Sequence, residues 1–170
     1  ATGLGYTAIK AASAGARVVT VEWDPAVVDV EHRNPWSAAL FTDDAIDRRQ
    51  GDIAEVIESF EEAAFDHILH DPPVLELAGD LYGVTFYHQL RRVLAPRGRL
   101  FHYVGNLDSP SGLRVSRGVV RRLEEAGYDG VLSVELEDHH FWATPELQQE
   151  GLIRSRDYVG QFLKADADDD

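Results

Sequence analysis

The chain has 170 residues, which is enough for one domain with a buried core. It contains no cysteine, which excludes disulfides and thiolate metal sites, and it has no run of about 18 apolar residues that would predict a membrane span. The formal net charge of −14 argues against non-specific binding of nucleic acid at low salt. The seven histidines show no metal-ligand spacing, and we expect a cytoplasmic protein without a metal or a membrane anchor.

The basic residues are unusual, because only Lys10 and Lys164 are lysines and the rest are arginines. An acidic, lysine-poor surface is typical of a protein kept soluble in concentrated salt, where screening removes most self-repulsion. The alternative is an ordinary acidic domain with a solvated tail, since residues 166–170 alone carry four aspartates. We favour the halophilic interpretation.

The chain opens on a glycine-rich turn, Gly3-Leu4-Gly5, directly before a predicted helix at 7–14. Glycine allows the backbone to bend sharply and a ligand to approach without a Cβ in the way. Such a turn normally follows a buried strand, but no apolar strand precedes Ala1. We therefore expect a nucleotide-type cofactor site and an upstream region of the same protein that this chain lacks. The alternative is a tight connection between a strand and a helix.

Acidic residues end the next two predicted strands. Glu22 closes a β-branched strand at 17–23, and Asp52 follows a weaker strand at 44–49. Ligands bind at the carboxyl ends of strands in open α/β sheets, so Glu22 would accept bonds from ribose hydroxyls and Asp52 from an adenine amine. Taken alone, Glu22 is better explained as an exposed strand end than as a ligand. Between and after the strands we predict helices at 25–33, begun by Asp24 and Pro25, and at 53–60.

The predicted strand at 65–70 ends in His70-Asp71-Pro72-Pro73. Two prolines after an acid force a rigid, extended exit, which would hold the Asp71 carboxylate over the cofactor crevice to accept a hydrogen bond from an amine. The alternative is a strand stop with Asp71 as a local cap. His70 points to the opposite face of the strand and is expected to be a packed, hydrogen-bonded histidine and not a base.

The rest of the pattern continues the alternation of an α/β domain with a parallel sheet. An amphipathic helix is predicted at 81–94, a strand at 99–104, a helix at 114–126, and two strands at 131–136 and 140–144. Residues 145–170 lack a persuasive pattern and are expected to form an acidic, partly disordered tail.

Four residues are candidates for contacting the substrate. Tyr82 would edge the pocket, and Asn106 lies in a Gly- and Ser-rich loop after the strand at 99–104. Arg114 and Arg117 would capture a phosphate or carboxylate, unless they are simply solvated side chains of a helix.

The ordered set of Gly3-Leu4-Gly5, Glu22, Gly51-Asp52 and Asp71-Pro72-Pro73 resembles the class I S-adenosylmethionine-dependent methyltransferases. More narrowly, the runs TGLGYTAI, NPWS, HDPP and GRLFHYVGN resemble a predicted archaeal methyltransferase group, over roughly residues 1 to 130. The resemblance implies a methyltransferase domain at 1–144 with a Rossmann-like, doubly wound, mostly parallel seven-stranded sheet, from which the first strand is missing.

The same resemblance implies roles for individual residues. Gly3 and Gly5 would contact the methionine part of S-adenosyl-L-methionine, Glu22 its ribose hydroxyls and Asp52 its adenine amine. Asp71 with Pro72 would face the methyl group and carry the catalysis. Two departures weaken the match: the family's acidic residue just before this turn is absent, and Val74 stands where amino-methylating relatives carry an aromatic.

The leading hypothesis is methyl transfer to a nitrogen nucleophile on RNA, a protein or a small amine. One alternative is an aminopropyltransferase of the polyamine-synthase type, which also uses an acid at the end of the fourth strand. A second is an NAD-binding dehydrogenase, since G-x-G-x-x-A with Glu22 fits that fingerprint too. A third, non-enzymatic alternative is a cofactor-binding or scaffold domain.

Overall fold

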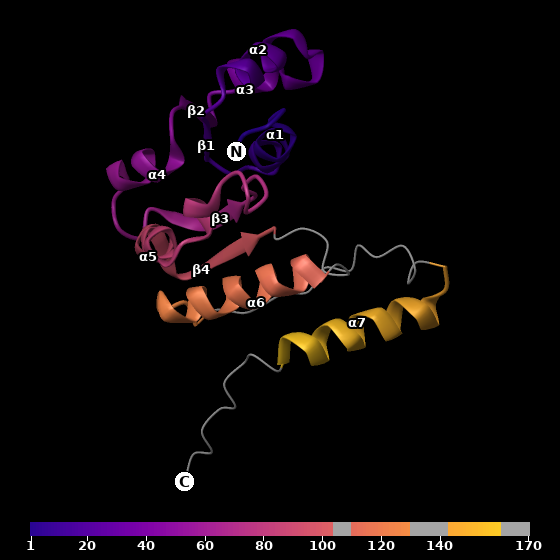
Figure 1. The fold of residues 1–170 in the computed structure, drawn as a ribbon. Helices are drawn as coiled ribbons and strands as arrows, with labels where there is room; N and C mark the ends of the chain where they lie inside the picture. The colour runs from indigo at the N-terminus through magenta and orange to yellow at the C-terminus, as the bar shows by residue number, and fades with distance from the viewer. Residues whose placement is uncertain (104–109, 130–142, 161–170) are drawn as a thin grey trace.

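The computed structural model describes residues 1–103, 110–129 and 143–160 (Figure 1). Helices and strands alternate through most of this part of the chain. In order they are α1 (Tyr6–Ser13), β1 (Val18–Glu22), α2 (Pro25–Arg33), η1 (Pro35–Ser37), α3 (Ala39–Thr42), β2 (Ile46–Gln50), α4 (Ile53–Val56), η2 (Ile57–Ser59), β3 (Phe65–His70), η3 (Gly79–Tyr82), α5 (Val84–Val93), β4 (Leu94–His102), α6 (Pro110–Glu125) and α7 (Pro145–Gly160).

The strands form two parallel pairs. β1 pairs with β2 from Val18↔Ile46 to Glu22↔Gln50, and β3 pairs with β4 up to His70↔His102. The parallel pairing agrees with the alternation of strands and helices in the sequence. The prediction of one doubly wound, seven-stranded sheet is wrong, because the described residues form two separate two-stranded sheets.

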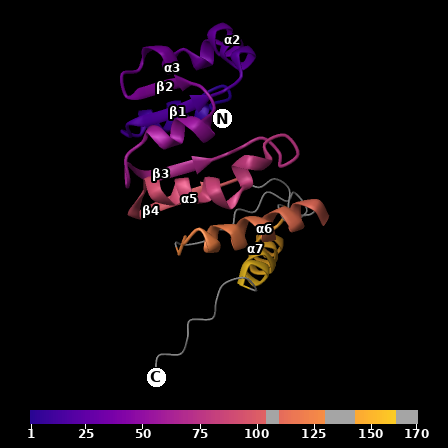
Figure 2. The ribbon, with the colours of Figure 1, turned by 60° about the vertical axis from the view of Figure 1, so that its left-hand side comes forward.

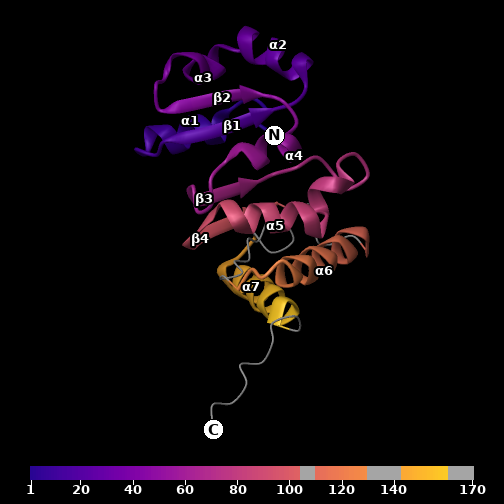
Figure 3. The same cartoon turned by 90° about the vertical axis from the view of Figure 1, so that its left-hand side faces the viewer.

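The two sheets are separate because β1 and β3 do not pair with each other. The N-terminus lies between them in both rotated views (Figures 2 and 3). There the Thr2 hydroxyl is 2.8 Å from that of Thr20, and the Ala1 ammonium donates to the Asp71 carbonyl oxygen at 3.3 Å. The count of seven strands came from a resemblance, and predicted strand residues 131–136 and 140–142 lie outside the described part of the chain.

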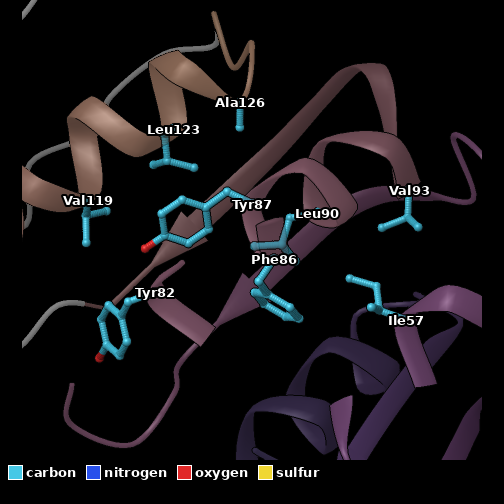
Figure 4. Packing of buried hydrophobic residues seen from close by; sticks show 9 residues of the cluster. All are labelled: Ile57, Tyr82, Phe86, Tyr87, Leu90, Val93, Val119, Leu123 and Ala126. Atoms are coloured by element: carbon cyan, nitrogen blue, oxygen red, sulfur yellow. The ribbon is translucent and has the colours of Figure 1, made fainter. Parts of the chain in front are cut away.

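Each sheet has its own apolar cluster. A small one joins α1, α3 and β2 through Ala8, Ala12, Leu40 and Ile46. A larger one lies where α5 and α6 cover one face of β3 and β4, and Figure 4 shows α6 side chains lying against those of α5. Its buried members are Ile57, Tyr82, Phe86, Tyr87, Leu90, Val93, Val119, Leu123 and Ala126. The larger cluster therefore extends along β3 and β4, and its member Tyr82 lies near their carboxyl ends, where the candidate site begins.

Several element boundaries differ from the predictions. β4 begins at Leu94 instead of residue 99, because Leu94 pairs with Phe65 and an irregularity around Pro96 separates this pair from His67↔Arg99. α5 begins at Val84, after the short turn η3, instead of at residue 81. Residues 145–160, which show no persuasive pattern in the sequence, form α7.

Candidate functional site

The glycine turn bends sharply through a left-handed backbone at both glycines. Gly3 and Gly5 have φ of 56° and 77°, and the Gly5 N–H donates to the Thr2 carbonyl at 3.0 Å. A Cβ on Gly5 would clash with the Leu40 side chain, whereas one on Gly3 would meet nothing within 4 Å. Glycine therefore serves a different purpose at each position. At Gly5 the missing Cβ allows the turn to pack against Leu40, and at Gly3 it leaves open space beside the backbone.

Glu22 ties this turn to the end of β1. Its buried carboxylate accepts a hydrogen bond from the Gly3 N–H on Oε2 at 3.1 Å and from the Asp24 N–H on Oε1 at 3.0 Å. The alternative of an exposed strand end is wrong, because Glu22 is buried and fixes the turn. A carboxylate has about four acceptor positions, so these two bonds leave about two unused.

Asp52 lies at the carboxyl end of β2 and is exposed. One of its carboxylate oxygens, Oδ1, accepts from the Ala54 N–H at 2.9 Å, which begins α4. The preceding Gly51 N–H donates to the Glu22 carbonyl at 2.9 Å. The ends of β1 and β2 are therefore joined through the backbone, with Asp52 on the same rim as Glu22.

Asp71 follows β3 directly and is exposed, whereas Pro72 is buried. The Asp71 carbonyl accepts from the Ala1 ammonium, so the loop after β3 and the glycine turn meet at the gap between the sheets. The structure thus brings Gly3, Glu22 and the Asp71 backbone to one edge, and their contact with a cofactor stays a prediction.

The predicted substrate residues are less closely grouped. Tyr82 is buried at 4 % exposure and its hydroxyl donates to the Pro73 carbonyl at 3.1 Å, so it supports the loop from below instead of edging a pocket. Arg114 and Arg117 lie in the first half of α6, where the Arg117 side chain is exposed. Asn106 lies outside the described residues.

Two paired histidines lie at the ends of β3 and β4, and one of them directly precedes Asp71 in the chain. His70 and His102 end β3 and β4, are paired in register, and have ring centroids 4.4 Å apart. Burial, with smaller effects of neighbouring charges, lowers the pKa of His70 to about 3 and that of His102 to about 4. Both are neutral at pH 7, and His70 is the packed, hydrogen-bonded histidine that the sequence predicts.

Sequence analysis missed the segment that supports the glycine turn. The Asn34 side-chain amide donates to the Tyr6 hydroxyl and to Ser37 Oγ, both at 2.9 Å, and Ser37 Oγ donates to the Leu4 carbonyl at 2.8 Å. Ser37 is fully buried. The run NPWS belongs to the resemblance, but its bonds to Tyr6 and Leu4 span 28 and 33 positions, so spacing alone does not reveal them.

Exposed aromatic and apolar groups surround the turn. Trp23 and Trp36 are 74 % and 73 % exposed, which is unusual for tryptophan. Beside the turn is an apolar surface hollow of about 340 Å³, lined by Gly3, Leu4, Ala26, Val27 and Val30. Trp23 follows Glu22 directly in the chain, but its side chain is exposed whereas that of Glu22 is buried.

In the part of the chain that the structure describes, no three His, Asp or Glu side chains form a group able to hold a metal ion. Within those residues, no helix is both long and apolar enough to cross a membrane.

A scan against models of known protein families finds no match. The chain is similar to the uncharacterized protein MJ1233 of Methanocaldococcus jannaschii, with 46 % identity over 134 residues. The similar region is 78 % of this chain but 46 % of that protein, so the chain spans about half the length of the curated relative it matches.

Proposed function

We propose that this chain forms the cofactor-binding part of an S-adenosylmethionine-dependent methyltransferase that methylates a nitrogen nucleophile. The observation that carries the proposal is the hydrogen bond from the Gly3 N–H to the Glu22 carboxylate, beside the contact between Ala1 and Asp71. These two contacts bring the glycine turn and the two acids to one edge, although they are separated by up to seventy positions in the sequence.

The residues at this edge fit the chemistry of such a cofactor. Open space lies above Gly3, so an amino-acid moiety would approach the backbone there. Glu22 has acceptor positions left for two ribose hydroxyls, and Asp52 is exposed on the adjacent rim. The apolar hollow beside Gly3 and the exposed Trp23 would cover apolar parts of the ligand.

The cofactor, when bound, supplies a methyl group already activated on a positively charged sulfur. The chain has only to align the acceptor and take up a proton. Asp71 would accept a hydrogen bond from the acceptor amine, orient its lone pair and receive the proton that the nitrogen loses. The buried Pro72 limits the freedom of the Asp71 backbone.

Only Arg114 and Arg117 bear on the chemical class of the methyl acceptor. The exposed Arg117, with Arg114 three positions before it, is suited to a phosphate or carboxylate on the substrate. RNA, a protein side chain and a small amine all remain candidates, and the substrate of the longer protein is part of this proposal.

The test is calorimetric titration of the chain with S-adenosylmethionine, in parallel with NAD. Wild type should bind the sulfonium cofactor saturably and NAD weakly or not at all. Asp71→Asn should abolish turnover in any acceptor assay, whereas the control Asp66→Asn, on the exposed start of the same strand, should leave it unchanged. S-adenosylhomocysteine is the expected product. Tight NAD binding, or methylthioadenosine as product, would contradict the proposal.

A further inference from the structure

Four aromatic rings form a buried group behind Asp71. His70 and His102 lie side by side, and Tyr82 and Tyr87 pack against them, with the His102 ring centroid 5.4 Å from Tyr82 and 5.7 Å from Tyr87. Tyr82 and Tyr87 belong to the larger apolar cluster (Figure 4). The proposed methyl transfer uses none of the four, although the group lies immediately behind its candidate catalytic acid.

The hydrogen bonds fix which ring nitrogens carry protons. His102 Nδ1 is 2.9 Å from the Tyr103 carbonyl oxygen, which can only accept, so this nitrogen donates. His102 Nε2 then accepts from the Tyr87 hydroxyl at 2.9 Å. By the same reasoning, His70 Nε2 donates to the Leu81 carbonyl at 2.9 Å. Because their lowered pKa values keep both rings neutral at pH 7, these bonds place the single proton of His102 on Nδ1 and that of His70 on Nε2.

These bonds close the loop that carries Asp71. The loop covers residues 71–81: His70 precedes it and holds Leu81 at its far end, and Tyr82 follows it and holds Pro73 near its start, at 3.1 Å. The residue before the loop therefore bonds to its last residue, and the residue after the loop bonds to one near its start. Beyond the base, the exposed Val74 and Leu77 mark its outer part.

We propose that His70 and Tyr82 are positioning residues that together hold loop 71–81, and with it Asp71, in its working position. The His70 contribution requires a proton on Nε2, which the Leu81 carbonyl oxygen accepts. The link to Asp71 rests on the proposed function, whereas the holding of the loop stands on the two hydrogen bonds alone.

Protonation would disturb this arrangement, because a second proton on either ring would be buried. The titratable and charged groups that act on the two rings or pack against them come from the chain start and from five elements. They are the Ala1 ammonium, Tyr82, Tyr87, Arg122 and the two histidines toward each other. Burial, together with the negative charges of Asp71 and Glu76, raises the pKa of Tyr82, so its hydroxyl remains a donor at neutral pH.

The experiment compares hydrogen–deuterium exchange and turnover in the full chain carrying His70→Leu, His70→Gln or Tyr82→Phe. His70→Leu removes the donor, whereas His70→Gln keeps an N–H at about the position of Nε2. Tyr82→Phe removes only the hydroxyl and keeps the buried ring, so it remains informative if His70→Leu does not fold. The control is His67→Leu, on the exposed part of the same strand.

We expect His70→Leu and Tyr82→Phe to speed exchange in residues 71–81 by about fivefold or more, the effect of one lost hydrogen bond, with β1 and β2 unchanged. His70→Gln should restore most of the protection. In an acceptor assay the two damaging variants should lower kcat with little change in KM for S-adenosylmethionine. Exchange in 71–81 equal to wild type in both would overturn the proposal. If wild type binds no S-adenosylmethionine, the proposed function fails, and the exchange comparison still decides whether the loop is held.

Discussion

The buried carboxylate of Glu22 accepts the backbone N–H of Gly3 at 3.1 Å, so the end of β1 is bonded to the glycine turn nineteen positions earlier in the chain. One acid thereby fixes the shape of the turn, and the proposed cofactor site assigns its remaining acceptor positions to ribose hydroxyls. Structure and proposed ligand binding depend on the same side chain.

Glu22→Gln should weaken both the fold of the glycine turn and the proposed binding of the cofactor. One carboxylate oxygen becomes an amide NH₂ that faces an N–H donor, which costs about 1–3 kcal/mol at a buried site. We expect a lower free energy of unfolding in urea and weaker S-adenosylmethionine binding. The matched control is Glu55→Gln, on the exposed surface of α4, which should change neither. Equal stability of the two variants would show that the bonds to Gly3 and Asp24 contribute nothing.

Gly5→Ala and Gly15→Ala separate backbone strain from packing. Both glycines have positive φ, 77° and 94°, but a Cβ on Gly5 would clash with Leu40 whereas one on Gly15 meets nothing within 4 Å. Gly15→Ala should cost about 1 kcal/mol from the left-handed backbone alone. Gly5→Ala should cost about 1–3 kcal/mol more, because Leu40 must move. The measurement is urea denaturation, and equal losses would mean that Leu40 yields without cost.

Ser37→Ala tests the support beneath the turn. Ser37 is fully buried and its hydroxyl donates to the Leu4 carbonyl, so its loss removes a part-buried hydrogen bond, at a cost of about 1 kcal/mol. Ser59→Ala removes a comparable bond, to the Val56 carbonyl at 2.7 Å, at an exposed site and should cost less than about 0.5 kcal/mol. Thermal unfolding of the two variants decides the comparison, and a smaller loss for Ser37→Ala would contradict it.

The sequence predicts the local elements well where a cap or a proline marks them. α2 covers Pro25–Arg33 as expected, because the Asp24 carboxylate accepts the Ala26 N–H, and β3 ends at His70 before two prolines. The start of β4 could not be predicted, since a Pro-Arg-Gly run indicates a break while the pairing of Leu94 with Phe65 bridges it. The prediction of a single sheet was wrong for a similar reason. The extent of a sheet depends on which strands pair through hydrogen bonds, and β1 and β3 do not pair.

For the candidate site, residue types at strand ends were enough to predict that Gly3, Glu22 and Asp71 share one edge. The roles of individual side chains were not predictable. Tyr82 has the spacing of a pocket residue but is buried beneath the loop, because its hydroxyl finds the Pro73 carbonyl. Such contacts depend on the path of a loop, and the spacing of apolar residues in the sequence does not predict that path.

Stability should fall as the pH is lowered from neutrality. The pKa values of His70 and His102 are depressed to about 3 and about 4 in the folded state, against 6.5 without burial. Between these values and 6.5 the unfolded state binds more protons, so stability is full above pH 6.5 and is lost progressively below it. Each ring should add up to about 1.4 kcal/mol per pH unit to the slope between pH 5 and 6.

Denaturation in urea at several pH values measures this slope. His70→Gln should reduce the slope by the share of one histidine, whereas His67→Gln, at an exposed position of β3, should leave it close to wild type. A slope unaffected by His70→Gln would mean that His70 titrates normally in the folded chain.

The most direct test of the central claim is an NMR titration of the uniformly ¹⁵N-labelled chain with S-adenosylmethionine. If the edge formed by the glycine turn, Glu22 and the loop after β3 is the cofactor site, the amide signals of Gly3, Gly5, Glu22, Asp52 and Asp71 will shift saturably, with one common affinity, while those of α7 stay in place. Absence of saturable shifts, or shifts confined to residues away from this edge, would contradict the account.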